Sequence, residues 1–142
     1  MVLFDVNVLI YSVNPQAADH QRYREWIDST IGSSSTFGVA DIVLSGFLRI
    51  VTNPKAFTAF STTDEAIKVV EGIRNRSNCL VIQPGMQHWG IFVDLCQRVN
   101  ARGNLVPDAY LAALAIESGS EWITTDRDYA RFPGLRWRHP LD

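Results

Sequence analysis

The sequence contains little cysteine, lysine or histidine, and it has no long hydrophobic run. Its 142 residues include two cysteines, two lysines and three histidines. Cys79 and Cys96 lie within apolar stretches, which favours buried free thiols over a disulfide or a thiolate metal site. No apolar stretch approaches the roughly 20 residues of a membrane-spanning helix, and no basic segment precedes the apolar N-terminus. We therefore expect a cytoplasmic protein that does not enter a membrane.

The net charge is small. Thirteen basic and fifteen acidic residues give a net charge of −2, which predicts no broad affinity for nucleic acid. Eleven of the basic residues are arginines, and four of these lie in the last sixteen positions, namely Arg127, Arg131, Arg136 and Arg138. Arginine suits bidentate phosphate binding, but ordinary surface ion pairs explain the same arginines equally well.

Length and composition predict one folded domain over residues 1–142. Hydrophobic residues make up 46% and charged residues 20%, values typical of soluble globular proteins. They exclude disordered, collagen-like and coiled-coil chains. A chain of this length buries about two thirds of its unfolded surface, which is enough for one sizeable core.

Strand-like and helix-like segments alternate along the chain. The apolar residues from Val2 to Ile10 predict a buried first strand that ends near Asp5. Further strands are predicted at 36–39, 79–83, 121–125 and 135–138, and helices at 17–31, 42–52, 62–76, 89–99 and 107–118. This alternation favours an α/β fold with a mostly parallel sheet, in which ligands bind beyond the carboxyl ends of the strands.

Three aspartates stand at the ends of these elements. Asp5 follows the first strand, and Asp126 follows the strand at 121–125. Asp108 lies in the first turn of its helix, on the same face as the apolar residues three, four and seven positions later. An isolated carboxylate on a buried face needs a raised pKa, a cationic partner or a metal ion. Three such acids without histidine or thiolate ligands suit Mg²⁺ or Mn²⁺, ions that commonly serve phosphoryl transfer.

Polar neighbours could orient these carboxylates. Asn7 follows Asp5 by two residues, and Thr124 or Thr125 precedes Asp126. Each acid also has an ordinary structural explanation: Asp108 could complement the helix dipole, Asp126 could start a turn, and Asp5 could pair with a buried arginine. The residues alone leave the metal site and these explanations about equally weighted.

Four segments together resemble the PIN-domain family, and within it the toxins of VapBC-type toxin–antitoxin pairs. Each segment alone is weak, but in this order they cover nearly the whole chain. They are Leu3-Phe4-Asp5-Val6-Asn7-Val8-Leu9, Phe47-Leu48-Arg49-Ile50-Val51-Thr52-Asn53-Pro54, Val106-Pro107-Asp108-Ala109-Tyr110-Leu111-Ala112-Ala113-Leu114-Ala115 and Thr124-Thr125-Asp126-Arg127-Asp128-Tyr129-Ala130-Arg131-Phe132.

The resemblance implies a fold and an activity. It implies a three-layer α/β/α sandwich, an acidic Mg²⁺ or Mn²⁺ site, endoribonuclease activity on structured RNA such as tRNA or rRNA, a homodimer, and a VapB-type antitoxin that occludes the site. Asp5, Asp108 and Asp126 match the acidic positions of the family, and Asp128 matches an auxiliary one. Arg49 is a candidate for binding a substrate phosphate, or for pairing with one of these acids.

One position departs from the family pattern. The family usually has a glutamate directly before the Phe-Leu-Arg segment, where this chain has Gly46. Asp41 precedes Gly46 by five residues and lies about 140° around the predicted helix, so it does not simply replace the glutamate. The absence of this glutamate motivates an alternative to the ribonuclease function: a catalytically weak PIN-like module that binds RNA or protein. A phospho-accepting receiver domain ranks lower, because no lysine follows a predicted strand.

The remaining aromatic and histidine residues carry weaker expectations. Trp89 and Phe92 fit a buried helical stripe, which favours a core role over a base-stacking platform. The three histidines have no ligand or triad spacing, which favours surface or partner roles. The loop at 55–60 has two aromatics, Phe57 and Phe60, that suit either a dimer or antitoxin surface or simple packing.

Overall fold

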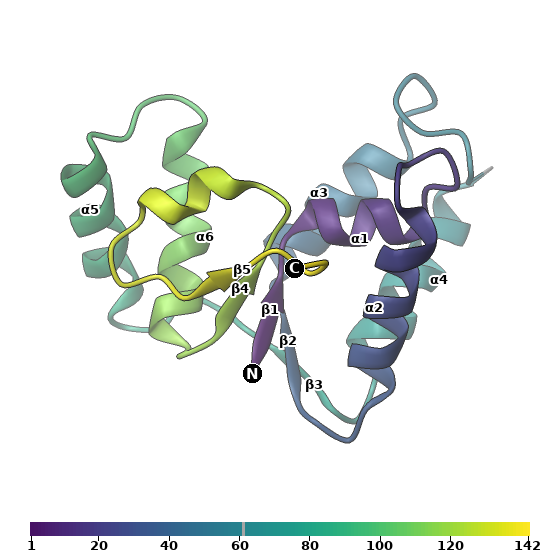
Figure 1. Ribbon diagram of the computed structural model, residues 1–142, viewed down its shortest axis with the longest axis horizontal. Coiled ribbons are helices and arrows are strands. Elements are labelled where there is room, and N and C mark those ends of the chain that lie inside the picture. Colours follow the sequence, from purple (N-terminus) through teal and green to yellow (C-terminus); the bar gives the residue numbers. More distant parts are fainter. Residues whose placement is uncertain (61) are drawn as a thin grey trace.

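The computed structural model describes residues 1–60 and 62–142, which form a parallel sheet covered by helices (Figure 1). The sheet has the strand order β3-β2-β1-β4-β5, and every neighbouring pair is parallel. The strands are β1 (Val2–Phe4), β2 (Phe37–Val39), β3 (Cys79–Val81), β4 (Glu121–Ile123) and β5 (Trp137–Arg138). The helices are α1 (Val6–Val13), α2 (His20–Gly32), α3 (Asp41–Val51), α4 (Thr63–Arg74), α5 (His88–Val99) and α6 (Leu105–Glu117), and a 3₁₀ helix, η1, spans Arg127–Arg131.

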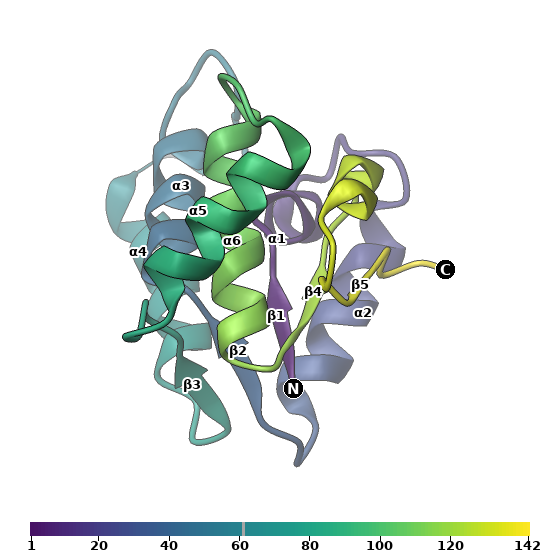
Figure 2. The same cartoon turned by 90° about the vertical axis from the view of Figure 1, so that its left-hand side faces the viewer.

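The helices cover both faces of the sheet. Figure 1 shows α5 and α6 on one side of β1 and β2, and α2 and α4 on the other. The view in Figure 2 places α5 and α6 in front of the strands. The predicted α/β/α sandwich with a parallel sheet is therefore confirmed. None of the helices within the described residues is long and apolar enough to cross a membrane.

The predicted first strand is present and ends at Phe4, directly before Asp5, but the helix that follows it was not predicted. One strand was expected within the run from Val2 to Ile10, but the chain leaves the sheet after Phe4 and enters α1. Asp5 causes the change, because its backbone is extended and its Oδ1 accepts a hydrogen bond from Val6 N at 2.7 Å. This N-cap interaction satisfies a free amide at the start of the helix.

The other predicted elements are present with small shifts in their ends. Thr62 caps the start of α4, since its Oγ1 accepts a hydrogen bond from Glu65 N at 3.2 Å. Pro107 lies in the first turn of α6, where its missing amide costs no hydrogen bond. Both cysteines are free thiols, and both are half-buried.

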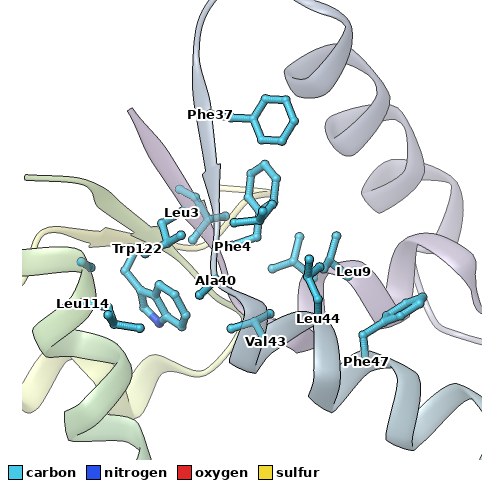
Figure 3. Packing of buried hydrophobic residues seen from close by; sticks show 14 of the residues in the cluster. Leu3, Phe4, Leu9, Phe37, Ala40, Val43, Leu44, Phe47, Leu114 and Trp122 are labelled. Carbon is cyan, nitrogen blue, oxygen red and sulfur yellow. The ribbon is translucent and has the colours of Figure 1, made fainter. Parts of the chain in front are cut away.

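The core fills the space between the sheet and the helices on each side. Figure 3 shows Phe4 of β1 beside Phe37 of β2, and their ring centroids lie 5.6 Å apart in a stacked arrangement. On the α6 side, the fully buried Trp122 lies near Leu114. Phe57 is also buried, and its ring centroid lies 5.2 Å from that of Phe60. Both rings pack against the core, so the loop at 55–60 is part of the packed structure.

Candidate active site

Parallel pairing of β1 with β4 brings two polar residues side by side at the carboxyl end of the sheet. Phe4 is opposite Ile123, and Asp5 N donates to the Ile123 carbonyl at 2.9 Å. The next residue after each strand is therefore Asp5 on one and Thr124 on the other. Thr124 Oγ1 donates to Asp5 Oδ2 at 2.6 Å. Asp5 is only 4% exposed, so this hydroxyl is an important partner for a buried carboxylate.

Asn7 connects the first turn of α1 to the end of β4. Its Nδ2 donates to Asp5 Oδ2 at 3.1 Å and to Thr124 Oγ1 at 3.2 Å, and its Oδ1 accepts from Thr125 N at 3.2 Å. Thr124 and Thr125 were both candidates for orienting the acids. The hydroxyl that contacts Asp5 belongs to Thr124, and Thr125 contributes its backbone amide.

Asp126 lies next to this network. Its backbone N donates to Thr124 Oγ1 at 3.0 Å, and its Oδ1 accepts from Asp128 N at 2.9 Å. The second bond caps η1, so the turn-forming role considered for Asp126 is present. The Asp128 side chain is exposed. One Asp126 oxygen thus holds the turn.

Asp108 belongs to α6, which covers the face of the sheet opposite α2 and α4. It lies in the first turn of α6 and is half-buried. Tyr129 OH donates to Asp108 Oδ1 at 3.3 Å, and Tyr129 is itself buried within η1. Sequence reasoning missed Tyr129; the available signal was an aromatic residue three positions after Asp126.

Asp5, Asp108 and Asp126 line one pocket of about 620 Å³. Gly46 and Arg49 of α3 form part of its wall, and Arg49 is exposed. The remaining lining residues are Val6, Asn7, Ile42, Val43, Phe92, Val106, Pro107, Tyr110, Leu111 and Tyr129. Acids that are 103 and 121 positions away from Asp5 in the sequence thus face the same space.

Burial and mutual repulsion disfavour ionisation in this pocket. The pKa of Asp5 is raised to about 6, mainly because the carboxyl group is buried. The hydrogen bonds from Thr124 and Val6 lower this pKa, and the negative charges of Asp108 and Asp126 raise it. Burial also raises the pKa of Asp108, which the Tyr129 hydrogen bond opposes. The phenol pKa of Tyr129 is well above its usual range, because it is buried beside Asp5 and Asp108, so Tyr129 stays a donor.

The chain matches a known family over almost its full length. Residues 2–135 match the PIN domain. The chain belongs to the PIN-domain family.

Several curated relatives are VapC ribonucleases. Ribonuclease VapC43 of Mycobacterium tuberculosis is 39% identical over 142 residues, which is 100% of this chain and 97% of that protein. Ribonuclease VapC25 of the same organism is 34% identical over 140 residues, covering 99% of each. The fold is similar to that of a solved VapBC2 structure from Rickettsia felis bound to a promoter DNA fragment, with a TM-score of 0.72 at 16% identity over 97% of this chain and 98% of that one.

The donor set of this PIN domain fits a hard divalent cation. Within residues 1–60 and 62–142, no lysine, arginine or histidine forms an ion pair with Asp5, Asp108 or Asp126, so the pairing considered for Asp5 does not occur. Carboxylate oxygens suit Mg²⁺ and Mn²⁺. In that same part of the chain, no three acidic, thiol or imidazole side chains already cluster closely enough to hold an ion. An ion here would take part of its shell from water, as Mg²⁺ usually does.

Gly46 leaves space in the wall of the pocket. A Cβ built at this position would meet only Val6 Cγ2, at 3.9 Å. Asp41 does not fill the space, because it forms an ion pair with Arg74 at 2.9 Å and faces a different pocket. This PIN domain therefore has three acids around the pocket, with room for the side chain that Gly46 lacks.

Two expectations for the start of α5 were wrong. Trp89 was expected in the core but is 68% exposed, whereas Phe92 is half-buried and packs against the core as expected, at the wall of the acidic pocket. His88 was expected at the surface but is 2% exposed, and its Nε2 lies 3.0 Å from the Tyr110 carbonyl. The helix is rotated so that His88, rather than Trp89, faces α6.

Replacing Thr124 should destabilise the PIN domain. Thr124→Val removes the hydroxyl bonded to Asp5, Asn7 and the Asp126 amide, and leaves a buried carboxylate short of a partner. We expect the free energy of unfolding to fall by about 1–3 kcal/mol in urea denaturation at neutral pH. Thr125→Val is the matched control, because only the Thr125 backbone bonds to Asn7, and it should change stability by less than about 0.5 kcal/mol. Equal losses in the two variants would contradict this role of Thr124.

The buried Asp5 should make the stability of the metal-free protein depend on pH. The pKa of Asp5 rises from 3.8 to about 6 on folding, so the folded state binds more protons between these values. Stability therefore falls as pH rises from about 4 to about 6. Asp5→Asn has no titrating group at this position. Between these pH values the free energy of unfolding of the wild type should therefore fall by on the order of 3 kcal/mol relative to that of the variant. Urea denaturation at several pH values without divalent ions measures it, and parallel pH curves would refute it.

Proposed function

We propose that this protein is a divalent-metal-dependent endoribonuclease, the toxin of a VapBC-type toxin–antitoxin pair. The observation that carries the proposal is the pocket that Asp5, Asp108 and Asp126 line together, with no ion-pair partner for any of the three among residues 1–60 and 62–142. A purely structural role does not explain three acids that raise each other's cost of ionisation. The ribonuclease names of relatives at 34–39% identity support the same activity.

Each acid would hold the ion in an orientation set by its neighbours. Thr124 and Asn7 fix Oδ2 of Asp5, and Tyr129 fixes Oδ1 of Asp108. Asp126 keeps one oxygen for the turn and has its second oxygen left for the ion or its waters. When bound, Mg²⁺ or Mn²⁺ would lower the pKa of a water molecule for attack on the phosphodiester and offset charge on the leaving oxygen.

Arg49 would bind an RNA phosphate. It lines the acidic pocket, is exposed, and forms no ion pair within the described part of the chain. A free guanidinium facing the site is suited to a neighbouring phosphate by its bidentate geometry. We propose tRNA or rRNA as the substrate class, with products that carry 5′-phosphate and 3′-hydroxyl ends.

The proposed partners follow from the relatives. The Rickettsia felis structure with a similar fold is of VapBC2, a complex that includes the antitoxin. For this chain we propose a VapB-type antitoxin and a homodimer.

Cleavage of RNA by the purified protein tests the proposal. Total bacterial RNA is incubated with the protein in Mg²⁺, in Mn²⁺ and in EDTA, and the new 5′ ends are sequenced beside an Asp5→Ala control. We expect discrete cuts that need a divalent ion and are absent from the control. The absence of cuts from the folded protein in either metal would overturn the nuclease proposal.

A second candidate function rests on Gly46. With three acids rather than four around the pocket, the domain could bind RNA or protein with little catalysis. RNA binding in a gel-shift assay, together with no cleavage in the experiment above, would favour this binding module.

A further inference from the structure

Three aromatic side chains form a ledge beside the acidic pocket. We call Trp89 and Phe92 of α5 and Tyr110 of α6 the aromatic ledge. The ring centroids of Trp89 and Phe92 lie 5.4 Å apart, and those of Phe92 and Tyr110 lie 5.6 Å apart. Trp89 is 68% exposed, whereas large aromatic side chains usually contribute to folding by burial. Folding stability therefore does not explain a tryptophan at this position.

The aromatic ledge is continuous with the candidate active site. Phe92 and Tyr110 line the same pocket as Asp108, and Tyr110 follows Asp108 by two residues in α6. Ile42 and Tyr110 also line an adjoining pocket of about 160 Å³, so the surface depression continues past the ledge. A strand of nucleic acid whose phosphate reaches the acids would pass these rings.

Buried contacts hold the aromatic ledge in place. His88 lies under it, nearly parallel to Phe92 at 6.2 Å between ring centroids and edge-on to Tyr110 at 4.4 Å. His88 Nε2 also lies 3.0 Å from the Tyr110 carbonyl, which ties α5 to α6. A rigid aromatic surface loses little conformational entropy when a flat ligand stacks on it.

We propose that Trp89 and Phe92 stack against an unpaired base of the RNA next to the cleaved phosphate, and so position the substrate. This inference rests on the proposed ribonuclease function. A nucleotide combines an anionic phosphate with a planar base, and this surface offers a partner for each. Arg49 and a divalent cation held by the acids would bind the phosphate, and the exposed ring of Trp89 with the half-buried ring of Phe92 would bind the base. Stacking on aromatic side chains is the usual way in which proteins bind unpaired bases.

RNA binding without cleavage tests the aromatic ledge separately from the nuclease. Asp108→Asn serves as the background, and the probe is a single-stranded oligoribonucleotide carrying 2-aminopurine, titrated in Mg²⁺. Adding Trp89→Ala should weaken binding about 5- to 100-fold, the range expected for one stacked base. Trp89→Phe keeps an aromatic face and should stay within about threefold of the background.

The spectroscopic signal separates stacking from a structural role. Stacking on the indole quenches the 2-aminopurine emission, and this quenching should disappear in Trp89→Ala while circular dichroism stays unchanged. Met86→Ala is the matched control, because Met86 is fully exposed two residues before α5. It should leave both affinity and quenching unchanged.

Kinetics of the otherwise wild-type enzyme give the second readout. A stacking contact present before and during reaction changes binding, so Trp89→Ala should raise KM by a similar factor and leave kcat within about threefold. If Trp89→Ala keeps the RNA affinity and the 2-aminopurine quenching of the background, the proposed stacking on the aromatic ledge is wrong. The nuclease proposal would be unaffected. The proposed stacking would also be overturned if Trp89→Ala lost dimerisation or antitoxin binding but kept its RNA affinity. Trp89 would then be a contact between proteins. RNA binding that depends on Trp89 in a protein that never cleaves would instead overturn the nuclease proposal alone.

Discussion

Asp108→Asn is expected to reduce RNA cleavage by at least about a hundredfold without unfolding the protein. Loss of an outer partner of a metal ligand typically costs 10- to 100-fold in activity or metal affinity, and loss of a ligand should cost at least as much. Asp108 is half-buried and its one side-chain hydrogen bond comes from Tyr129, which an asparagine oxygen also accepts. The fold therefore tolerates the change while the pocket loses a negative charge. Single-turnover cleavage of a labelled RNA in Mg²⁺ measures the effect.

Asp94→Asn is the matched control for this experiment. Asp94 is an exposed aspartate on α5 whose ion pair with Arg98 spans one helical turn. Such surface pairs contribute little, so this variant should cleave RNA at the wild-type rate. If folded Asp108→Asn retains wild-type cleavage, the proposed site is wrong. If both variants lose cleavage equally, the effect of Asp108→Asn reflects general charge rather than its place in the pocket.

The placement of the acids could be predicted from the sequence because it follows from sheet topology. Parallel strands end at the same edge, so the segments that follow β1 and β4 had to lie at one edge of the sheet once both strands were assigned to it; the direct pairing of β1 with β4 was not part of the expectation. The expectation for Asp5 and Asp126 used only this rule. The pairing register, which places Thr124 rather than Thr125 against Asp5, depends on contacts 119 positions apart in the sequence and was not predictable.

The helix after β1 was missed because its apolar residues continue those of the strand. A run of consecutive apolar residues suits a buried strand, and periodicity alone does not separate this from a buried helix. Two signals were nevertheless present: Asp5 is a good N-cap residue, and Val6, Ile10 and Val13 have helical spacing. The break at Asp5 is what turns this carboxylate toward Thr124 and into the pocket.

The orientation of α5 could not be read from its amphipathic pattern. His88, Trp89 and Phe92 all fit a stripe that faces the interior, and tertiary packing decides which of them is buried. The bond between His88 and the Tyr110 carbonyl selects the imidazole, and the indole then faces solvent. A feature of this kind depends on how two helices meet, which no local pattern contains.

Gly46→Glu is expected to increase the affinity for Mn²⁺ on the order of tenfold or more. The change adds a carboxylate to a pocket that already holds three, and affinity for hard cations rises with the charge of the ligands. The space exists, because a Cβ at Gly46 meets only Val6 at 3.9 Å. Without metal the added charge repels Asp5 and Asp108, which offsets part of the roughly 1 kcal/mol of helix propensity gained by replacing glycine.

Gly72→Glu distinguishes the pocket from the helix. Gly72 is an exposed glycine within α4, also with open space for a side chain, so this variant gains the same helix propensity without adding charge to the acidic pocket. Calorimetric titration with Mn²⁺ should show tighter binding for Gly46→Glu than for Gly72→Glu or the wild type. A ligand that binds only the folded state stabilises it by an amount that grows with the logarithm of the ratio of ligand concentration to Kd, so Mn²⁺ should also raise the Tm of Gly46→Glu the most. Equal Mn²⁺ affinity in all three proteins would place the ion away from Gly46 and would remove the missing glutamate as an explanation for weak catalysis.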